Sequence, residues 1–433
     1  MCRCACFSRL ALLDELEDTV YGQIITATLF PGVRLVVITP DCHHGYGVPV
    51  GCAIVTDPER SAVALGPVGF DIGCGMVSLR SSVPADAATE QRRLAFNRAV
   101  MRRVSMGQGE RGVGRLAGLT GAEFERLIRG GADYYSARYG DRMDRTKAER
   151  NCIPVPDSWQ LPRSRADRGM GQLGSLGGGN HFIELQRSEE AATLFVQIHT
   201  GSRGFGHGLA EHYFHVAKAA QPDVIRNLDE AWFAPGTAQR EDYLGAVAAG
   251  GNYAIINRLV IAEEVGAAFR EVFGSDLELV YEISHNLVQR EWSDEFGWVN
   301  VHRKGATRAF PAHHPALADT PWFDTGHPVL IPGSNRDWSY ILRPTGSSKS
   351  AYTVNHGAGR RMSRTAAKKR LDQTLIDADY RRAGIVVNLD GRVPIDESGP
   401  AYKSSAEVIG AITGAGLAEV EHRLWPLASL KAR

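Results

Sequence analysis

The stretch VGFDIGCGM, residues 68–76, puts the Asp71 carboxylate and the Cys74 thiol three residues apart in a glycine-rich turn. Four further segments set a histidine beside glycines or at the edge of an apolar run. They are GSLGGGNHFIEL (174–185), VQIHTGSRGFG (196–206), YEISHNLVQRE (281–291) and VNHGAGRRMSR (354–364). Nearly all adjoin a predicted strand, and loops that leave strand ends can converge on one site.

The donor types in these segments suit a transition metal. A carboxylate, a thiolate and imidazoles are its usual protein ligands, and a thiolate can bridge two ions. Five donors are more than one tetrahedral ion needs, so they favour a two-metal site with open positions. These candidates are Asp71, Cys74, His181, His199 and His285. The alternative is that each histidine is an ordinary core or surface residue.

The segment that begins at His356 differs from the others. HGAGRRMSRTAAKKR (356–370) runs from a glycine turn into a basic predicted helix. Backbone N–H groups at such a turn can bind an anion, and the basic face can neutralise phosphate. A solvated basic helix is the alternative. A second turn of this kind is IPGSNRDWS (331–339), with the hydroxyls of Ser334 and Ser339.

Together these features indicate metal-assisted phosphoryl or nucleotidyl transfer, in which an imidazole attacks an α-phosphate. The residues alone do not separate this chemistry from metal-assisted phosphate-ester hydrolysis. Asp41, His43 and His44, in PDCHHGYGVPVG (40–51), are either groups near the substrate or parts of a structural turn. Cys2, Cys4 and Cys6 lack the spacing of a zinc site.

The pattern of elements predicts an α+β protein with mixed sheets, flanking helices and metal ligands at strand ends. We expect an N-terminal segment over residues 1–30, partly frayed, and one large domain over residues 31–433. Strands are predicted at 34–39, 194–198, 277–283, 298–302, 329–331 and 339–342. Helices are predicted at 89–104, 120–139, 242–273, 363–378 and 404–425, the third either buried or broken at Gly250–Gly251. Residues 151–179 are predicted to form a long loop.

Composition bounds the class of protein. The 433 residues carry no formal net charge and are 43% hydrophobic, which excludes a disordered chain and a wholly basic polyanion binder. The seven cysteines are scattered rather than arranged as a disulfide framework. The first 18 residues, MCRCACFSRLALLDELED, show no signal-peptide cleavage site, because acidic residues directly follow their short apolar run. No apolar run is long enough to span a bilayer. We therefore expect a cytoplasmic protein without a membrane partner.

Taken together, several segments resemble the RtcB family of RNA ligases. The similar stretches run from about residue 36 to the C-terminus. They are PDCHHGYGVPVG, VGFDIGCGM, LGGGNHFIE, HTGSRG, SHN, HRKGATRAFPA, IPGS, HGAGRRMSRTAA and AYK. The resemblance implies that residues 31–433 form an RtcB-like catalytic domain. It also implies an enzyme that joins RNA 3′-phosphate or 2′,3′-cyclic phosphate ends to 5′-hydroxyl ends, using GTP and manganese.

The resemblance also implies roles for individual residues. His356 would be the nucleophile that becomes guanylylated, and the five metal candidates would hold two Mn²⁺ ions with Cys74 as the bridge. The GTP contacts would come from Asn180, His181, Phe182, Ile183, Glu184, His285, Asn286, Pro332, Gly333, Ser334, Asn335, Ser339, His356, Gly357, Ala358, Gly359, Tyr402 and Lys431. RNA, including transfer RNA, would be the substrate, and an archease-like protein would be a possible activator.

The chain departs from the family pattern at two places. Asn335 stands where the family commonly has methionine, which bears on base preference. Residues 311–328, with His313, His314 and His327, are expected to be specific to this lineage. The order of metal affinities also favours zinc over manganese at thiolate and imidazole ligands, so zinc can occupy a purified sample. A hydrolase that uses the same ions without a nucleotide, and a non-catalytic RNA-binding subunit, are the alternatives.

Overall fold

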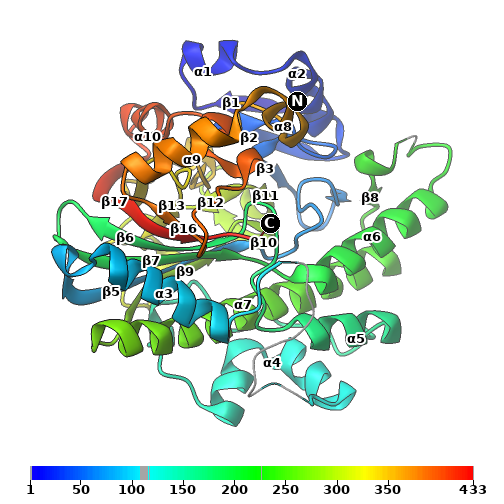
Figure 1. Ribbon diagram of the computed structural model, residues 1–433. Helices are drawn as coiled ribbons and strands as arrows, with labels where there is room; N and C mark the ends of the chain where they lie inside the picture. Colours follow the sequence, from blue (N-terminus) through cyan, green and yellow to red (C-terminus); the bar gives the residue numbers. More distant parts are fainter. Residues whose placement is uncertain (1, 108–115, 117, 226, 433) are drawn as a thin grey trace.

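The computed structural model describes residues 2–107, 116, 118–225 and 227–432 (Figure 1). Two sheets dominate it. The first has the strand order β1-β2-β3-β11-β10, with β1 parallel to β2 and the other pairs antiparallel. Its strands are β1 (Arg3–Cys6), β2 (Val33–His43), β3 (Val50–Thr56), β11 (Gly297–Lys304) and β10 (Asn286–Ser293).

The second sheet is larger and has eight strands, in the order β13-β14-β17-β6-β7-β5-β9 with β16 beside β17. Its strands are β13 (Val329–Ile331), β14 (Ser339–Pro344), β17 (Ala418–Leu430), β6 (Phe182–Ser188), β7 (Thr193–Thr200), β5 (Gly75–Pro84), β9 (Glu278–Ser284) and β16 (Val386–Val387). Two short pairs complete the strands: β12 (Ala306–Arg308) with β15 (Thr353–Asn355), and β4 (Val63–Ala64) with β8 (Trp232–Phe233).

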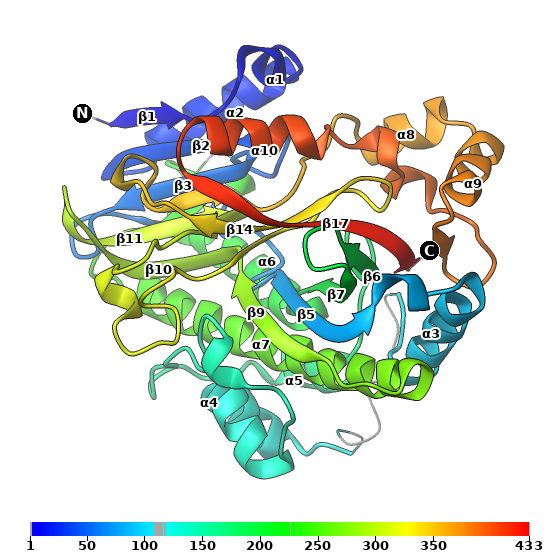
Figure 2. The same ribbon diagram turned by 90° about the vertical axis from the view of Figure 1, so that its left-hand side faces the viewer.

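The helices cover the sheets from several sides (Figures 1 and 2). Those at the two ends of the chain are α1 (Leu10–Asp14), α2 (Asp18–Leu29), α8 (Arg364–Arg370), α9 (Gln373–Arg382) and α10 (Ser405–Gly414). Those in its middle are α3 (Glu90–Arg103), α4 (Gly121–Tyr139), α5 (Arg163–Gln172), α6 (Arg203–Ala220) and α7 (Ala238–Phe273). The expectation of mixed sheets with flanking helices is confirmed.

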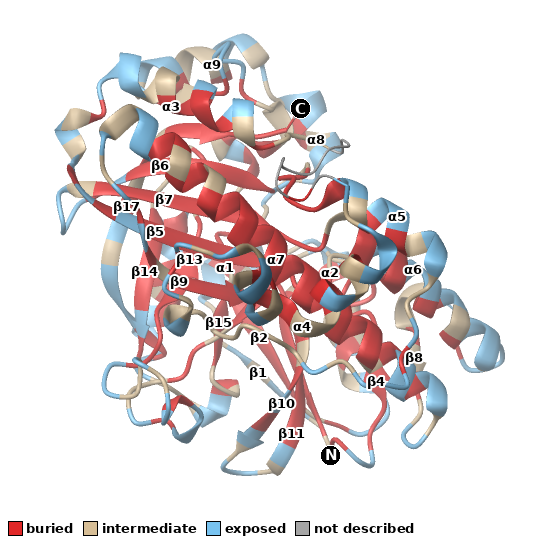
Figure 3. Cartoon of the chain, turned by 90° about the horizontal axis from the view of Figure 1, so that it is seen from below, coloured by how far each residue is buried: buried red, intermediate tan, exposed pale blue. Residues whose placement is uncertain are grey.

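Helix α7 is the central support of the larger sheet. It packs against β5 and β7 and is flanked by α3, α4 and α6. Figure 3 shows it buried along nearly all its length. Among the described residues it is also the one helix long and apolar enough to cross a membrane, but 94% of that window is buried inside the protein, as in a core helix.

Of the two alternatives predicted for α7, burial is confirmed and a break at Gly250–Gly251 is not observed, because these glycines are sites of close packing. A Cβ on Gly250 would lie 3.0 Å from Ile72 Cγ2, and one on Gly251 would lie 2.5 Å from Ile153 Cδ1. The turn that carries Asp71 and Cys74 therefore rests directly on this helix.

Three sequence predictions are wrong in part. The helix expected over 363–378 is two helices, α8 and α9, because the Asp372 side chain accepts from Thr374 N and Leu375 N and begins α9. The helix expected over 404–425 ends at Gly414, and the chain continues as strand β17 between β14 and β6. The long loop expected over 151–179 contains helix α5.

The N-terminal segment joins the first sheet. β1 pairs with β2 from Arg3↔Leu35 to Cys6↔Ile38. Val20 and Ala27 of α2 pack in a hydrophobic cluster with Val36 and other residues of that sheet. The boundary between this segment and the large domain at residue 30 stays a prediction.

Candidate metal and nucleotide site

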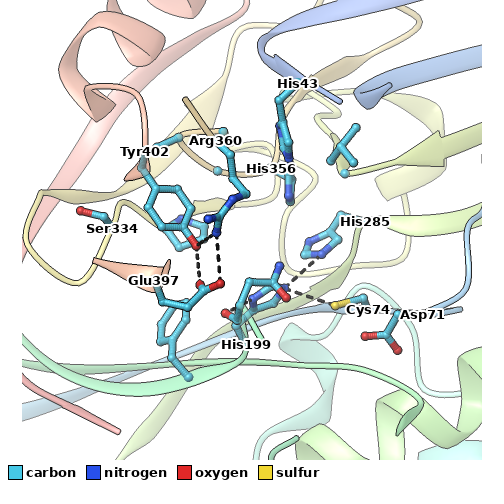
Figure 4. A pocket seen from close by; sticks show the side chains of 18 of the residues that line it. His43, Asp71, Cys74, His199, His285, Ser334, His356, Arg360, Glu397 and Tyr402 are labelled. Carbon is cyan, nitrogen blue, oxygen red and sulfur yellow. Dashed lines mark hydrogen bonds and ion pairs between the residues drawn. The ribbon is translucent and has the colours of Figure 1, made fainter. Parts of the chain in front are cut away.

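One cavity of about 300 Å³ gathers the glycine-flanked segments (Figure 4). Of the residues predicted to bind metal or nucleotide, those that line it are Asp71, Cys74, Asn180, Phe182, Glu184, His199, His285, Asn286, Pro332, Gly333, Ser334, Asn335, His356, Gly357, Ala358, Gly359, Tyr402 and Lys431. Segments up to 360 residues apart in sequence therefore meet at one place.

The turn with Asp71 and Cys74 is held from several directions. Arg258 of α7 is fully buried and donates to the Gly73 carbonyl oxygen (2.6 Å). The Asp71 Oδ1 atom accepts from the backbone N–H of Ser202 (3.0 Å) and from its hydroxyl (3.2 Å). A Cβ on Gly201 would lie 2.4 Å from the same oxygen, so glycine is needed for the backbone to approach the carboxylate.

The Cys74 sulfur lies at the centre of the donor atoms. It is 3.2 Å from His199 Nε2 and 3.6 Å from His181 Nε2. His181 Nε2 is 3.0 Å from Asp71 Oδ2, and His199 Nε2 is 3.2 Å from His285 Nε2. The donors form two groups, Cys74–His199–His285 and Asp71–Cys74–His181, whose ligand atoms lie within 4.8 Å of one another. Cys74 belongs to both groups, so this arrangement could hold two ions that share the sulfur.

Hydrogen bonds on the far side of the rings orient the imidazoles. His181 Nδ1 lies 3.0 Å from the Leu176 carbonyl oxygen, and His199 Nδ1 lies 3.1 Å from that of Asn180. A carbonyl can only accept, so each of these Nδ1 atoms carries a proton. His199 Nε2 thereby presents a lone pair to the cluster, whereas His181 Nε2 faces the Asp71 carboxylate. These partners fix the tautomer that a metal requires.

The electrostatics of the cluster also suit a cation. Burial, together with neighbouring imidazoles, lowers the pKa of His199 and of His285 well below the usual range, so both rings are neutral. Burial is the largest single influence on Asp71 and opposes its ionisation, but hydrogen bonds to His181 and Cys74, together with the charges of His181 and Arg203, outweigh it and lower the carboxyl pKa to about 2. Burial and the Asp71 charge raise the pKa of the Cys74 thiol. Since close neutral lone pairs repel, a cation among them would relieve that repulsion.

His356 stands beside this cluster and is held by Asp41. Its Nδ1 lies 2.7 Å from Asp41 Oδ2, which also accepts from the backbone N–H groups of His356 (3.1 Å) and Gly357 (3.3 Å). The Thr39 hydroxyl donates to the other carboxylate oxygen (2.6 Å). Burial would raise the pKa of Asp41, but its bonds to His356 and Thr39 lower it overall. The ring centroids of His356 and His285 are 4.8 Å apart.

Residues 23–432 match the family model described as tRNA-splicing ligase RtcB. The chain belongs to the RtcB family. A tRNA-splicing ligase RtcB of Pyrobaculum aerophilum is 34% identical, over 97% of this chain and 93% of its own. The RNA-splicing ligase RtcB of Mycobacterium tuberculosis is 35% identical, over 94% of this chain and 100% of its own.

Membership of the RtcB family supports an RNA ligase that acts on RNA and depends on metal. The same cavity is also lined by Glu184, which is buried. Burial raises the Glu184 carboxyl pKa to about 7, although the hydrogen bond from Gln186 Nε2 (2.7 Å) and the nearby Lys431 oppose this. The cavity therefore combines a cluster of donors that could hold a metal with a buried carboxyl group whose pKa is about 7.

Three predicted nucleotide contacts do not reach the cavity. The Ile183 side chain points into the main hydrophobic core, as expected for a strand residue between two that face the site. The Ser339 hydroxyl lies behind the wall and accepts from the Gly333 N–H (3.0 Å) and from Gln186 (3.0 Å). His181 contacts Asp71 and Cys74 but is not among the residues that line the cavity.

Asn335 does line the cavity, yet its side-chain oxygen accepts a hydrogen bond from the hydroxyl of Tyr380. Its carbonyl oxygen is thus engaged by the protein rather than left for a nucleotide base.

Sequence reasoning missed Glu397. This buried carboxylate accepts from the Tyr402 hydroxyl and lies 3.1 Å from Arg360, 3.2 Å from Arg364 and 3.3 Å from Lys431 (Figure 4). It lies in VPIDESGP (393–400), which carries no histidine or cysteine, so only its partners in space reveal it. Glu397 thus holds three cationic side chains of the cavity lining close together. Arg360 also lies over the Tyr402 ring, 5.0 Å from its centroid.

Proposed function

We propose that this protein is a GTP- and manganese-dependent RNA ligase. It joins an RNA 3′-phosphate, or a 2′,3′-cyclic phosphate after its hydrolysis, to a 5′-hydroxyl end. His356 attacks the α-phosphate of GTP and releases pyrophosphate. The RNA 3′-phosphate then takes the guanylyl group to give an RNA-ppG end, and the 5′-hydroxyl displaces GMP. The names of the relatives point to transfer RNA as the substrate class.

The pairing of His356 with Asp41 is the observation that carries this proposal. A carboxylate on Nδ1 fixes the proton there and leaves the Nε2 lone pair free for attack. The same carboxylate stabilises the positive charge that the ring gains when it is phosphorylated through Nε2. A hydrolase without a covalent step would have no need of an imidazole held in this way.

The five donors fit two manganese ions in type and placement. Asp71, Cys74 and His181 would hold one, and Cys74, His199 and His285 the other. When bound, the ions would offset negative charge on the phosphates and align the reacting groups. Zinc in a purified sample would be held by the same atoms.

The opposite end of the cavity would take the nucleoside. Glu184 can accept from the N–H edge of guanine, and Phe182 and Tyr402 offer ring surfaces beside it. Lys431 lies 5.6 Å from the Phe182 ring centroid and 3.3 Å from Glu397, at the boundary between the base and the phosphates. We place the reaction in the cytoplasm, and the archease-like activator stays an expectation.

Intact mass after incubation with GTP and Mn²⁺ tests the proposal. The expected result is one GMP adduct on the wild-type protein and none on His356→Ala. His313→Ala is a matched control, because that histidine is exposed and lies outside the cavity. Turnover of 3′-phosphate and 5′-hydroxyl RNA that does not change when GTP is omitted would refute the proposal and favour a hydrolase.

A further inference from the structure

A second cavity, of about 380 Å³, adjoins the first. One wall is formed by residues 15–20, where α1 gives way to α2, and the other by residues 360–364, just before α8. His43, Arg360 and Arg364 line both cavities. A ligand that fills both would therefore pass these three side chains.

The guanidinium groups around the second cavity pair with different carboxylates. Arg360 and Arg364 both pair with the buried Glu397. Arg361 pairs instead with Glu15 across the cavity, and these side chains are 50% and 27% exposed. An exposed ion pair contributes little stability, and a phosphate offers a guanidinium the same paired oxygens as a carboxylate. A phosphate can thus replace Glu15 as the partner of Arg361 at small cost.

The rest of the cavity surface combines apolar, aromatic and polar side chains, the polar ones being Glu17, Thr19 and Ser363. Val20 is buried, and Leu16 and Met362 are half-buried at the same place. The exposed imidazole of His44 stands beside them. A surface that joins aliphatic side chains and an imidazole to guanidinium groups suits a nucleotide, with its base on the former and its phosphate on the latter.

We propose that the second cavity binds the terminal nucleotide of the RNA strand that carries the 3′-phosphate. This inference rests on the proposed function. That strand must reach guanylylated His356 before the 5′-hydroxyl strand reacts. Its end should therefore bind next to His43, Arg360 and Arg364, the side chains that line both cavities. Residues 15–20 precede residues 23–432, which match the family model. The wall they form is thus contributed by a part of the chain outside that match.

Steady-state ligation at saturating GTP and Mn²⁺, with the concentration of the 3′-phosphate strand varied, tests this. Arg361→Gln should raise KM for that strand roughly tenfold, because a charge-assisted contact is lost. Glu15→Gln should lower it about twofold, because Arg361 is released from an exposed pair. An abasic 3′-terminal nucleotide should raise KM for the wild-type protein. Arg343→Gln and Glu419→Gln are matched controls, since this pair (2.5 Å) is exposed and lines neither cavity.

Three results would overturn the inference: unchanged KM in Arg361→Gln, a change confined to KM for GTP, or sensitivity to an abasic residue only in the 5′-hydroxyl strand. Failure of the proposed function would look different, as a wild-type protein with no GMP adduct and no ligation. In that case, fluorescence anisotropy would measure the affinity of the labelled 3′-phosphate strand for the wild type and for Arg361→Gln. Equal affinities would show that the second cavity does not bind this strand.

Discussion

Replacing Glu184 with glutamine tests how the buried end of the cavity is charged. Burial raises the pKa of this carboxyl from 4.5 to about 7. The folded protein therefore favours the protonated carboxyl group over the carboxylate. This difference from the unfolded chain contributes its full stabilisation of the fold below about pH 4.5. That contribution is lost as the pH rises from 4.5 through 7. Above pH 7 the folded protein carries the full cost of a buried carboxylate.

The size of the effect follows from the shift. One pKa unit corresponds to about 1.4 kcal/mol, so the carboxylate destabilises the wild type by about 3 kcal/mol at pH 8. Glutamine does not ionise, and its side-chain oxygen can still accept from Gln186. With an unfolding entropy of roughly 2 cal/mol/K per residue, 3 kcal/mol corresponds to about 3 °C in a chain of this length.

The assay is thermal unfolding followed by circular dichroism, without metal or GTP, at pH 5 and pH 8. The Tm of Glu184→Gln minus that of the wild type should be about 3 °C larger at pH 8 than at pH 5. Glu419→Gln is the control, because Glu419 is exposed. Its Tm minus that of the wild type should be the same at pH 5 and pH 8. An equal difference for Glu184→Gln at both pH values would show that burial does not hold this carboxyl in its neutral form.

Three further predictions concern the metal end of the cavity. Asp41→Asn should slow formation of the GMP adduct at least ~100-fold, because an amide cannot hold the His356 tautomer or its developing charge; a rate within threefold of wild type, by quenched-flow mass measurement, would contradict this. Cys74→Ser should reduce bound manganese after dialysis, since both donor groups lose their shared ligand; two retained equivalents by elemental analysis would exclude a bridging sulfur. Arg258→Met should destabilise the fold by about 2–3 kcal/mol, because the Gly73 carbonyl loses its buried donor and Glu282 keeps only Arg145 of its two guanidinium partners; an unchanged denaturation midpoint would argue against this.

That the five candidate metal donors lie close together was predictable from the sequence, because each lies at or near the end of a strand; metal binding itself stays a prediction. The sheet holds the ends of its strands in fixed positions, so residues at neighbouring strand ends can meet at one site. His199 near the end of β7 and His285 just after β9 flank Cys74, which directly precedes β5, and β5 pairs with both β7 and β9. Local sequence was enough there.

The errors arose where long-range contacts decide the local structure. Residues 418–430 contain good helix formers, yet β14 and β6 supply strand partners on both sides. The pair Gly250–Gly251 suggested a helix break, but its function is to admit Ile72 and Ile153. Glu397 has no motif around it, because its importance lies in the cations that converge on it from distant segments. No window of sequence holds that information.

If two ions bind as proposed, the single sulfur between the two donor groups would make the order of metal loading matter. In the group with His199 and His285 the rings are already neutral, so the first ion to arrive must displace the proton of the Cys74 thiol. The second ion then meets a thiolate that is already formed. Affinity for the first ion should rise with pH, affinity for the second should be nearly independent of it, and calorimetry in buffers of different ionisation enthalpy should count one proton from this thiol for two metals. A single atom would thereby make occupancy of the two positions cooperative.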